Sequence, residues 1–295
     1  MRRHAVLLVL IPSLAGSLAP GLFAQQKLER RFAVDSNVSI RITNMAGTTR
    51  IIGWDRDSIA ITGSIAPGAS FFGGGKGGFA KLGVERSDET LAAPGSTLEV
   101  RVPRGARLAV KSGTASIEAT GLTGELQCVS VSGTIQVDGG LRLLVAESMD
   151  GNLDVGGPIG VSRITGGRGT VTLRDIRGDI LATTVAGPIT ATRGMVSRAH
   201  LETISGAISY EGDVDRRGTL ETVTHAGDVT LRLPATIAAE FELQTFEGKI
   251  ETDLFPKGRV QHRPADGSPW TFATAGGGAQ VSVRSFKGTI RVLKQ

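Results

Sequence analysis

Glycine recurs at nearly constant intervals through the middle of this chain, between short stretches in which apolar and polar residues alternate. The glycines in this context are Gly113, Gly133, Gly151, Gly169, Gly187, Gly206, Gly227 and Gly248, separated by 20, 18, 18, 18, 19, 21 and 21 residues. Gly47 and Gly288 stand in similar text near the two ends. A period of 18 to 21 residues is typical of a solenoid, in which each repeat forms one coil stacked on the next.

Apolar residues stand two and four positions after most of these glycines, with a mostly polar residue between them. The pairs are Ala115/Ile117, Ile135/Val137, Leu153/Val155, Val171/Leu173, Ile189/Ala191, Ile208/Tyr210, Val229/Leu231, Ile250/Thr252 and Ile290/Val292. This period of two predicts strands with one buried face. The position two before the glycine is often apolar too, and we interpret it as the same alternation in the preceding strand: Val131, Met149, Val185, Ile204, Phe246 and Phe286. Each glycine should then occupy a corner between two strands.

The composition agrees with a thin aliphatic core. The chain has 41 glycines in 295 residues, while Phe, Tyr and Trp together make up only 4%. We therefore predict an all-β, single-chain β-solenoid of stacked coils of 18–21 residues with a strand-rich N-terminal cap. Successive coils should place Ile135, Leu153, Val171, Ile189 and Ile208 in one column.

The start of the chain, residues 1–24, has the pattern of a secretory signal peptide. Arg2 and Arg3 precede an apolar run from Ala5 to Ile11, and Ala24 is a small residue before the expected cut at Gln25. Leu22 is not ideal three residues before that cut, so cleavage after Ala24 is not assured. An uncleaved membrane anchor is the alternative, but Pro12, Gly16 and Pro20 interrupt the stretch. We predict an exported protein of the bacterial periplasm or cell surface, with no membrane span after signal cleavage.

Neither the net charge nor the cysteine content indicates a nucleic-acid partner, a disulfide or a reactive thiol. Loss of the two signal arginines lowers the formal net charge from +5 to +3, so nothing in the charge argues for nucleic acid. Cys128 is the only cysteine, which excludes an internal disulfide. Because it lies in an apolar-rich strand, we expect an inert buried thiol.

The chain outside the signal is predicted to form a single domain, residues 25–295, in four parts. Residues 28–105 form a strand meander that caps the stack, residues 106–252 the regular coils, residues 253–279 a loop excursion, and residues 280–295 the final coil. Glycines in residues 71–83 invite comparison with a phosphate-binding loop, but Gly77 stands where Ser or Thr is required. We expect a surface loop there, with Phe71, Phe72 and Phe79 exposed.

Several of these features resemble one known family. They are the repeated S-G-x-I and E-T-I-S-G text, the opening strand meander, and the glycine triplet before a last K-G-T-I-R-V coil. Together they resemble the bacterial "putative adhesin" family of exported proteins, a domain of unknown function, over residues 35–295. The resemblance implies a β-solenoid and no catalytic residues. Lys111 and Gly167 depart from it, since both replace the apolar residue expected before a corner glycine.

The sequence contains no motif that we assign to catalysis, a metal or a cofactor. Asp138, Asp150, Asp154 and Asp175 fall in adjacent coils, but their offsets from the corner glycines differ, so we interpret them as solvated turn residues. The histidines, His4, His200, His225 and His262, lack metal-ligand spacing. Ser132 and Ser205 precede corner glycines without a G-x-S-x-G motif, and we interpret them as small corner residues.

These observations favour a non-catalytic, cell-envelope binding or scaffolding protein, similar to an adhesin, with an unidentified envelope polysaccharide or protein as partner. The alternative is a carbohydrate-active enzyme, a polysaccharide lyase or hydrolase, that uses a groove of the solenoid. Convergence of three or more acidic and basic side chains in one groove would favour the enzyme. A third hypothesis is self-assembly through uncovered end coils.

Overall fold

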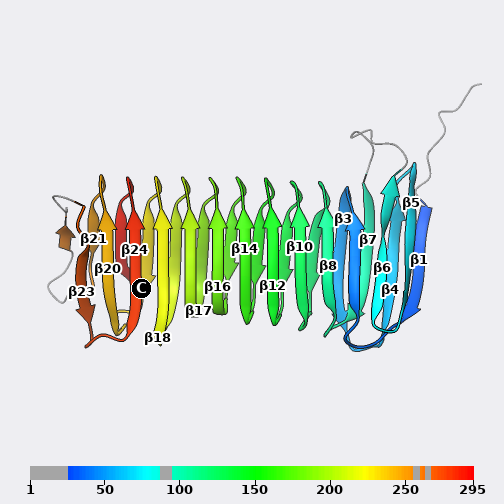
Figure 1. The fold of residues 1–295 in the computed structure, drawn as a ribbon, viewed down its shortest axis with the longest axis horizontal. Helices are drawn as coiled ribbons and strands as arrows, with labels where there is room; N and C mark the ends of the chain where they lie inside the picture. The colour runs from blue at the N-terminus through cyan, green and yellow to red at the C-terminus, as the bar shows by residue number, and fades with distance from the viewer. Residues whose placement is uncertain (1–25, 87–94, 255–259, 263–266) are drawn as a thin grey trace, which may run out of the picture.

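The computed structural model describes residues 26–86, 95–254, 260–262 and 267–295. These residues form 25 strands and no helix, which confirms the all-β class. The strands run across the molecule and stack along its long axis (Figure 1). The predicted signal, residues 1–24, lies outside the described residues. No helix among the described residues is long and apolar enough to span a membrane.

Each regular coil contributes two strands, one to each of two faces. The first strands are β8 (Arg107–Ser112), β10 (Glu125–Ser130), β12 (Leu143–Ser148), β14 (Val161–Gly166) and β16 (Arg177–Thr184). The second strands are β9 (Ser116–Thr120), β11 (Ile135–Asp138), β13 (Leu153–Gly156) and β15 (Val171–Arg174). Every first strand pairs in parallel with the first strand of the next coil, and every second strand does the same.

Two long strands carry the pattern onward. β17 (Ile189–Thr203) and β18 (Ile208–Thr224) each serve as the second strand of one coil and the first strand of the next. Their register shifts between Thr192 and Gly194 and between Val196 and Arg198. These irregularities accommodate the longer glycine spacings of this region, since a coil with extra residues must leave some of them unpaired between its two strands.

The predicted apolar column is present. Ile135 pairs with Leu153, Leu153 with Val171, Val171 with Ile189, and Ile189 with Ile208, all in parallel register. All five side chains are buried, so the prediction is confirmed. Because the strands of successive coils stay in register, the same positions of each coil face the core.

A buried hydroxyl lies three residues before most corner glycines. Thr224, for example, donates to the carbonyl oxygen of Gly206 in the preceding coil (3.3 Å) and accepts from the N–H of Gly227 (3.0 Å). Thr203, Thr245 and Ser285 make the same two contacts at their own corners. These hydroxyls satisfy backbone groups that the turn removes from the ladder.

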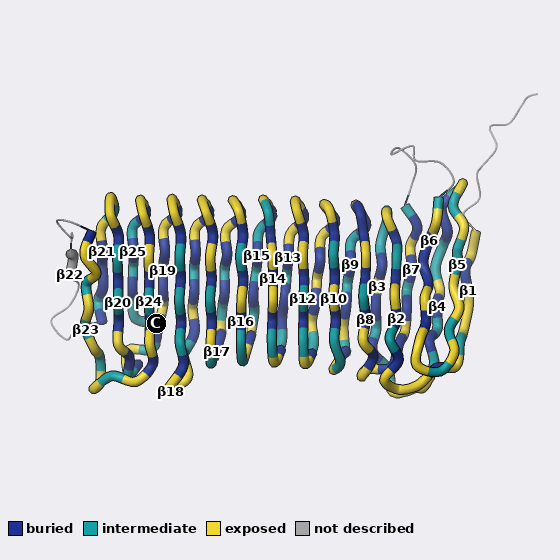
Figure 2. The backbone as a smooth tube through the Cα atoms, viewed as in Figure 1, coloured by how far each residue is buried: buried dark blue, intermediate teal, exposed yellow. Residues whose placement is uncertain are grey.

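The apolar residues two before the glycines point outward, and here the sequence interpretation is wrong. Val131, Met149, Val185, Ile204, Phe246 and Phe286 are between 37% and 66% exposed. The hydroxyl residue just before each of them is buried, so the following side chain must leave the core. The corners share one long edge of the stack, where Figure 2 shows mostly exposed residues. We call the side chains at this position, with Met45 and His225, the exposed ridge.

The first corner is also shifted by two residues from the sequence alignment. Ile117 pairs with Ile135, and a Cβ on Gly133 would meet the carbonyl oxygen of Ala115. Ala115, and not Gly113, therefore occupies the corner, while Gly113 stands at the position of the exposed ridge. Lys111 consequently plays no part in this corner.

The N-terminal end does not follow sequence order. β2 (Ser39–Asn44) and β3 (Gly47–Trp54) form one coil, and β8 and β9 form the coil stacked on it. The chain does not pass directly from the first of these coils to the second but makes a long excursion. It forms β4 (Ser58–Ile65), β5 (Ala69–Lys76), β6 (Phe79–Arg86) and β7 (Ser96–Pro103). β6 and β7 pair in parallel with β2 and β3 on their outer side. The coil of β2 and β3 comes first in the chain but second in the stack, because the coil of β6 and β7 lies outside it.

Antiparallel strands cover this end. β4 pairs with β7 and with β1 (Gln26–Ala33), and β5 pairs with β6. The segment that we expected to be a loop, residues 71–83, instead lies largely in the β5–β6 hairpin, whose two strands are joined by a tight turn at Gly77 (φ 58°). Phe79 is exposed as expected, whereas Phe71 and Phe72 are only partly exposed.

The C-terminal end uses the same device. The chain passes from β19 (Val229–Leu233) to β20 (Ala239–Thr245) and β21 (Ile250–Thr252), then returns as β24 (Ala279–Ser285) and β25 (Ile290–Lys294). β24 inserts between β18 and β20, and β25 between β19 and β21. Residues 280–295 are therefore the final coil in the chain but not in the stack, and Figure 1 shows the C-terminus inside it.

The expected loop of residues 253–279 also contains two strands. β22 (Val260–His262) pairs antiparallel with β21, and β23 (Trp270–Thr274) pairs antiparallel with β20. The outermost strands β22 and β23 at the C-terminal end, and β5 at the N-terminal end, thus run against the direction of the coils, so they do not offer a template for adding another parallel coil. β1 is the exception, because it pairs antiparallel with β4, which itself runs against the coils.

Candidate functional site

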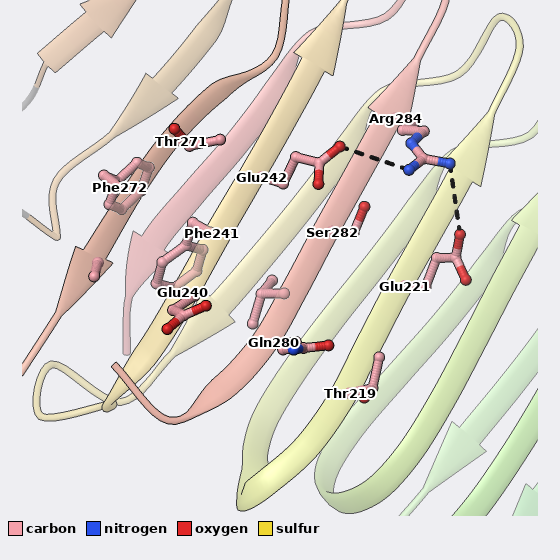
Figure 3. A pocket seen from close by; sticks show the side chains of 12 residues that line it. Thr219, Glu221, Glu240, Phe241, Glu242, Thr271, Phe272, Gln280, Ser282 and Arg284 are labelled. Atoms are coloured by element: carbon pink, nitrogen blue, oxygen red, sulfur yellow. Dashed lines mark ion pairs between the residues drawn. The ribbon is translucent and has the colours of Figure 1, made fainter. Parts of the chain in front are cut away.

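A groove lies on the face of the first strands near the C-terminal end of the stack. It crosses β18, β24, β20 and β23, and we call it the C-terminal groove (Figure 3). Its polar side chains are Thr219, Glu221, Glu240, Glu242, Thr271, Gln280, Ser282 and Arg284. Apart from the Ser282 hydroxyl, they reach solvent because they alternate with buried residues such as Leu220, Val281 and Leu243.

An ion-pair network crosses one side of this groove. The His200 ring places Nδ1 3.0 Å from a Glu221 carboxylate oxygen and Nε2 3.1 Å from a Glu202 carboxylate oxygen. The Arg284 guanidinium lies 3.9 Å from the Glu221 carboxylate and 3.6 Å from the Glu242 carboxylate. The network therefore joins coils that are distant in sequence.

Burial and neighbouring charges act on His200 in opposite directions. Partial burial disfavours the charged ring, but hydrogen bonds to Glu202 and Glu221 and the negative charges of both outweigh it, so the pKa of His200 is raised. When the ring is protonated, both of its nitrogens donate to these carboxylates.

The raised pKa of His200 predicts a pH-dependent stability. The contribution should be fully present below the pKa of an unfolded histidine and lost as pH rises through the folded pKa. His200→Gln should lower the free energy of unfolding more at pH 5.5 than at pH 8.5, by less than about 1 kcal/mol because solvent screens a partly exposed pair. Urea unfolding at the two pH values measures this difference. Equal losses at both would contradict the assignment.

Aromatic side chains close the outer end of the groove. Phe272 of β23 stacks on Phe241 of β20, with ring centroids 4.8 Å apart, and the Trp270 ring lies 5.1 Å from the Phe272 ring. Phe241 is buried, while Phe272 is partly exposed. The groove thus passes from charged and hydroxyl groups to an aromatic edge.

One hydroxyl in the groove lacks a partner. The Ser282 Oγ is buried and makes no hydrogen bond to any described residue. It stands on β24 among the labelled side chains of Figure 3, near Glu242 and Arg284. Since buried polar groups are nearly always satisfied, we expect a water molecule or a ligand group to complete the hydrogen bonding of this hydroxyl.

A second groove lies at the other end of the stack. Arg30, Arg31 and Arg101 line it with Glu29, Glu99 and Trp54. The Arg31 guanidinium lies 5.7 Å from the Trp54 ring centroid, and the Glu99 carboxylate pairs with Arg101 at 2.9 Å. This site carries more positive charge than the C-terminal groove but shows no unsatisfied hydroxyl among its described lining residues.

The four aspartates singled out from the sequence do not form one cluster. Asp150 pairs with Arg168, Asp154 with Arg174 and Asp175 with Arg193, at 2.7, 2.8 and 2.7 Å. The hydrogen bonds from their arginines lower the pKa of Asp150 and of Asp175. These pairs join neighbouring coils, so the aspartates are surface cross-links and not only turn residues. The sequence signal was an arginine one period after Asp150 and after Asp175.

The other candidate residues are placed as follows. Cys128 is buried, as expected, and desolvation raises the pKa of its thiol to about 12. His225 stacks on Phe286 at 4.9 Å on the exposed ridge. Ser132 and Ser205 are exposed corner residues, as expected. His4 and the side chain of His262 lie outside the described residues, and Asp138 does not take part in the ion pairs of the neighbouring aspartates.

Within the described residues, no group of three or more His, Cys, Asp or Glu side chains is arranged to hold a metal ion. The sequence did not indicate the His200 network, because its members lie on four strands, β17, β18, β20 and β24. Two of them, Glu242 and Arg284, are brought together only by the insertion of β24.

Comparisons with known proteins find a distant likeness to solved structures alone. No family model and no curated protein matches the chain. A solved structure of a "putative adhesin" from Parabacteroides merdae is 13% identical, with a TM-score of 0.48, and covers 90% of this chain and 96% of its own. A "putative cell adhesion protein" from Clostridium sporogenes is 9% identical, with a TM-score of 0.26, and covers 92% and 100%.

Proposed function

We propose that this chain is an exported β-solenoid that binds a component of the bacterial cell envelope without catalysis, as an adhesin or scaffold does. Rigid parallel strands hold the side chains of the C-terminal groove at fixed spacings, about 4.8 Å from coil to coil. A preorganised surface of this kind loses little entropy when it binds an extended chain.

The unsatisfied Ser282 hydroxyl is the observation that carries this proposal. It lies in a groove that also offers carboxylates, an amide at Gln280, and the partly exposed ring of Phe272. Sugars are bound by such combinations, since their hydroxyls pair with carboxylates and amides while their C–H faces pack on aromatic rings. A polysaccharide of the envelope is the ligand class that we favour.

One observation favours the enzymatic alternative. Glu202, Glu221, Glu242, His200 and Arg284 converge in or beside the groove, which meets the criterion of several acidic and basic groups in one place. A glycosidase, however, needs one carboxylic acid kept protonated by an apolar enclosure and a second free to attack. Here Glu202, Glu221 and Glu242 already pair with a cation. Glu240, the fourth carboxylate, lies with them on an open sheet face that offers no apolar enclosure, so we favour binding.

Replacement of Ser282 by alanine tests the site. Ser282→Ala should leave the free energy of unfolding unchanged or raise it, because a buried hydroxyl without a partner is removed. It should weaken binding to an envelope polysaccharide about tenfold, the loss of about one hydrogen bond. Residues 25–295 would be titrated against a panel of envelope glycans by calorimetry, with Ser209→Ala on the opposite face as the matched control.

Two results would contradict the proposal. Turnover of any glycan in the panel, with release of reducing ends or unsaturated products, would establish the enzyme. Binding that Ser282→Ala and Ser209→Ala weaken equally would place the site elsewhere on the molecule.

A further inference from the structure

The exposed ridge is a mostly apolar strip, interrupted by Gly113, Gly167 and His225, that the groove does not explain. In spatial order its positions are held by Met45, Gly113, Val131, Met149, Gly167, Val185, Ile204, His225, Phe286 and Phe246. Backbone hydrogen bonds between the corners keep this order, as from Asp150 N–H to the Val131 oxygen (2.9 Å) and from Glu247 N–H to the Phe286 oxygen (2.9 Å). Ten corners at about 4.8 Å make a straight strip on the order of 40 Å long.

The area of the ridge matches one half of a protein dimer. Its seven aliphatic and aromatic side chains are 37% to 66% exposed. A fully exposed aromatic side chain presents about 150–250 Å² and an aliphatic one less, so together they present roughly 600 Å² of apolar surface. A stable interface buries about 800 Å² per partner, and monomers seldom expose an apolar patch above about 600 Å². Small exposed neighbours, Ser132, Ala186, Ser205 and Ala226, would let a partner approach closely.

We propose that two copies of this chain associate along their exposed ridges, antiparallel, about a two-fold axis between the corners of Gly167 and Val185. A straight, rigid strip is best matched by another of equal length. In this arrangement the two ridge positions without a side chain, Gly113 and Gly167, face Phe286 and Val185. Met149 faces Ile204, Met45 faces Phe246, and Val131 faces His225.

Charge beside the ridge favours a second copy over a lipid surface. Asp150 pairs with Arg168 and Lys287 with Glu247, both within one chain, so these flanking charges are neutralised locally. Two identical ridges would therefore not repel each other. A membrane-binding edge, in contrast, carries unpaired Lys and Arg beside its apolar residues.

The first test is the oligomeric state of residues 25–295 in solution. Sedimentation equilibrium should show a dimer, and Val185→Asp should weaken association at least tenfold because it places a carboxylate at the two-fold axis. Leu181→Asp is the matched control, since Leu181 is exposed on a sheet face of the same coil and lies off the ridge. Unchanged thermal unfolding of both variants would show that each still folds.

Engineered cysteines test the register. Cys128 is buried, so new thiols would be the reactive ones. Met149→Cys mixed with Ile204→Cys should form disulfide-linked dimers, whereas either variant alone should not, because like residues lie about three coils apart across the axis. A monomer at all concentrations, a dimer insensitive to Val185→Asp, or binding of anionic lipid vesicles through the ridge by a monomer would overturn the proposal. None of these results depends on whether the groove binds a glycan.

Discussion

Replacement of Gly187 by alanine is expected to unfold the middle of the stack. A Cβ at this position would lie 1.9 Å from the carbonyl oxygen of Gly169 in the preceding coil. The obstacle is backbone, so no side-chain rotation can relieve it, and any shift would break the parallel ladder between β15 and β17. We expect a loss above about 3 kcal/mol in the free energy of unfolding, in the range of severe packing defects. Urea unfolding followed by circular dichroism measures it.

Gly74→Ala is the matched control for that substitution. A Cβ on Gly74 would meet no atom within 4 Å, so the same chemical change should alter stability by less than about 0.5 kcal/mol. Neither Gly74 nor Gly187 has a positive φ, so close approach alone distinguishes them. If the two variants were equally stable, the corners could not be as tightly stacked as described. Ala115 does occupy one corner, beside Gly47, where the preceding turn follows a different backbone path (φ 109°).

Truncation after Thr274 is expected to remove more structure than the deleted segment itself. That segment includes β24 and β25, which lie between the coil of β18 and β19 and the coil of β20 and β21. Their loss leaves β20 and β21 without a parallel neighbour on the inner side. Because an isolated coil cannot bury its apolar face, Phe241, Leu243 and Ile250 should become exposed. Hydrogen exchange should show loss of protection throughout residues 239–252.

The regular coils provide the internal control for the truncation. Strands from β8 to β16 keep all their neighbours, so their exchange should remain slow in the shortened chain. A synthetic peptide of residues 275–295 should restore protection to residues 239–252 if the missing coil can be supplied from outside. Retained protection of β20 and β21 in the truncated chain would contradict the observed stacking order.

The central coils could be predicted from sequence because their determinants are local. Strands of period two, a corner at a nearly constant spacing and the column from Ile135 to Ile208 all follow from residues close in the chain. The buried thiol of Cys128 was predictable for the same reason, since its strand shows which positions face inward.

The exposed ridge was misassigned for a reason that the sequence does contain. A hydroxyl residue directly before each apolar one, as in Thr203–Ile204 and Ser285–Phe286, bonds the corner backbone and occupies the inward position. Side-chain direction therefore reverses at the corner. Ser and Thr are polar, so a rule based on hydropathy does not expect them to face inward. Such a rule instead places the apolar residue that follows them inside.

The sequence by itself determined the all-β class, the coil length and the inward faces of the central strands, because each depends on residues within one or two turns of the chain. Only the tertiary structure decided the stacking order at the two ends, where β6 and β7 lie outside β2 and β3, and where β24 and β25 return to fill an inner position. The site shares this dependence, since Arg284 meets Glu221 and Glu242 only after that return. The physical reason is that coils of nearly equal length and apolar pattern can pair with several partners, and the choice among them is made by long-range packing that local periodicity does not encode.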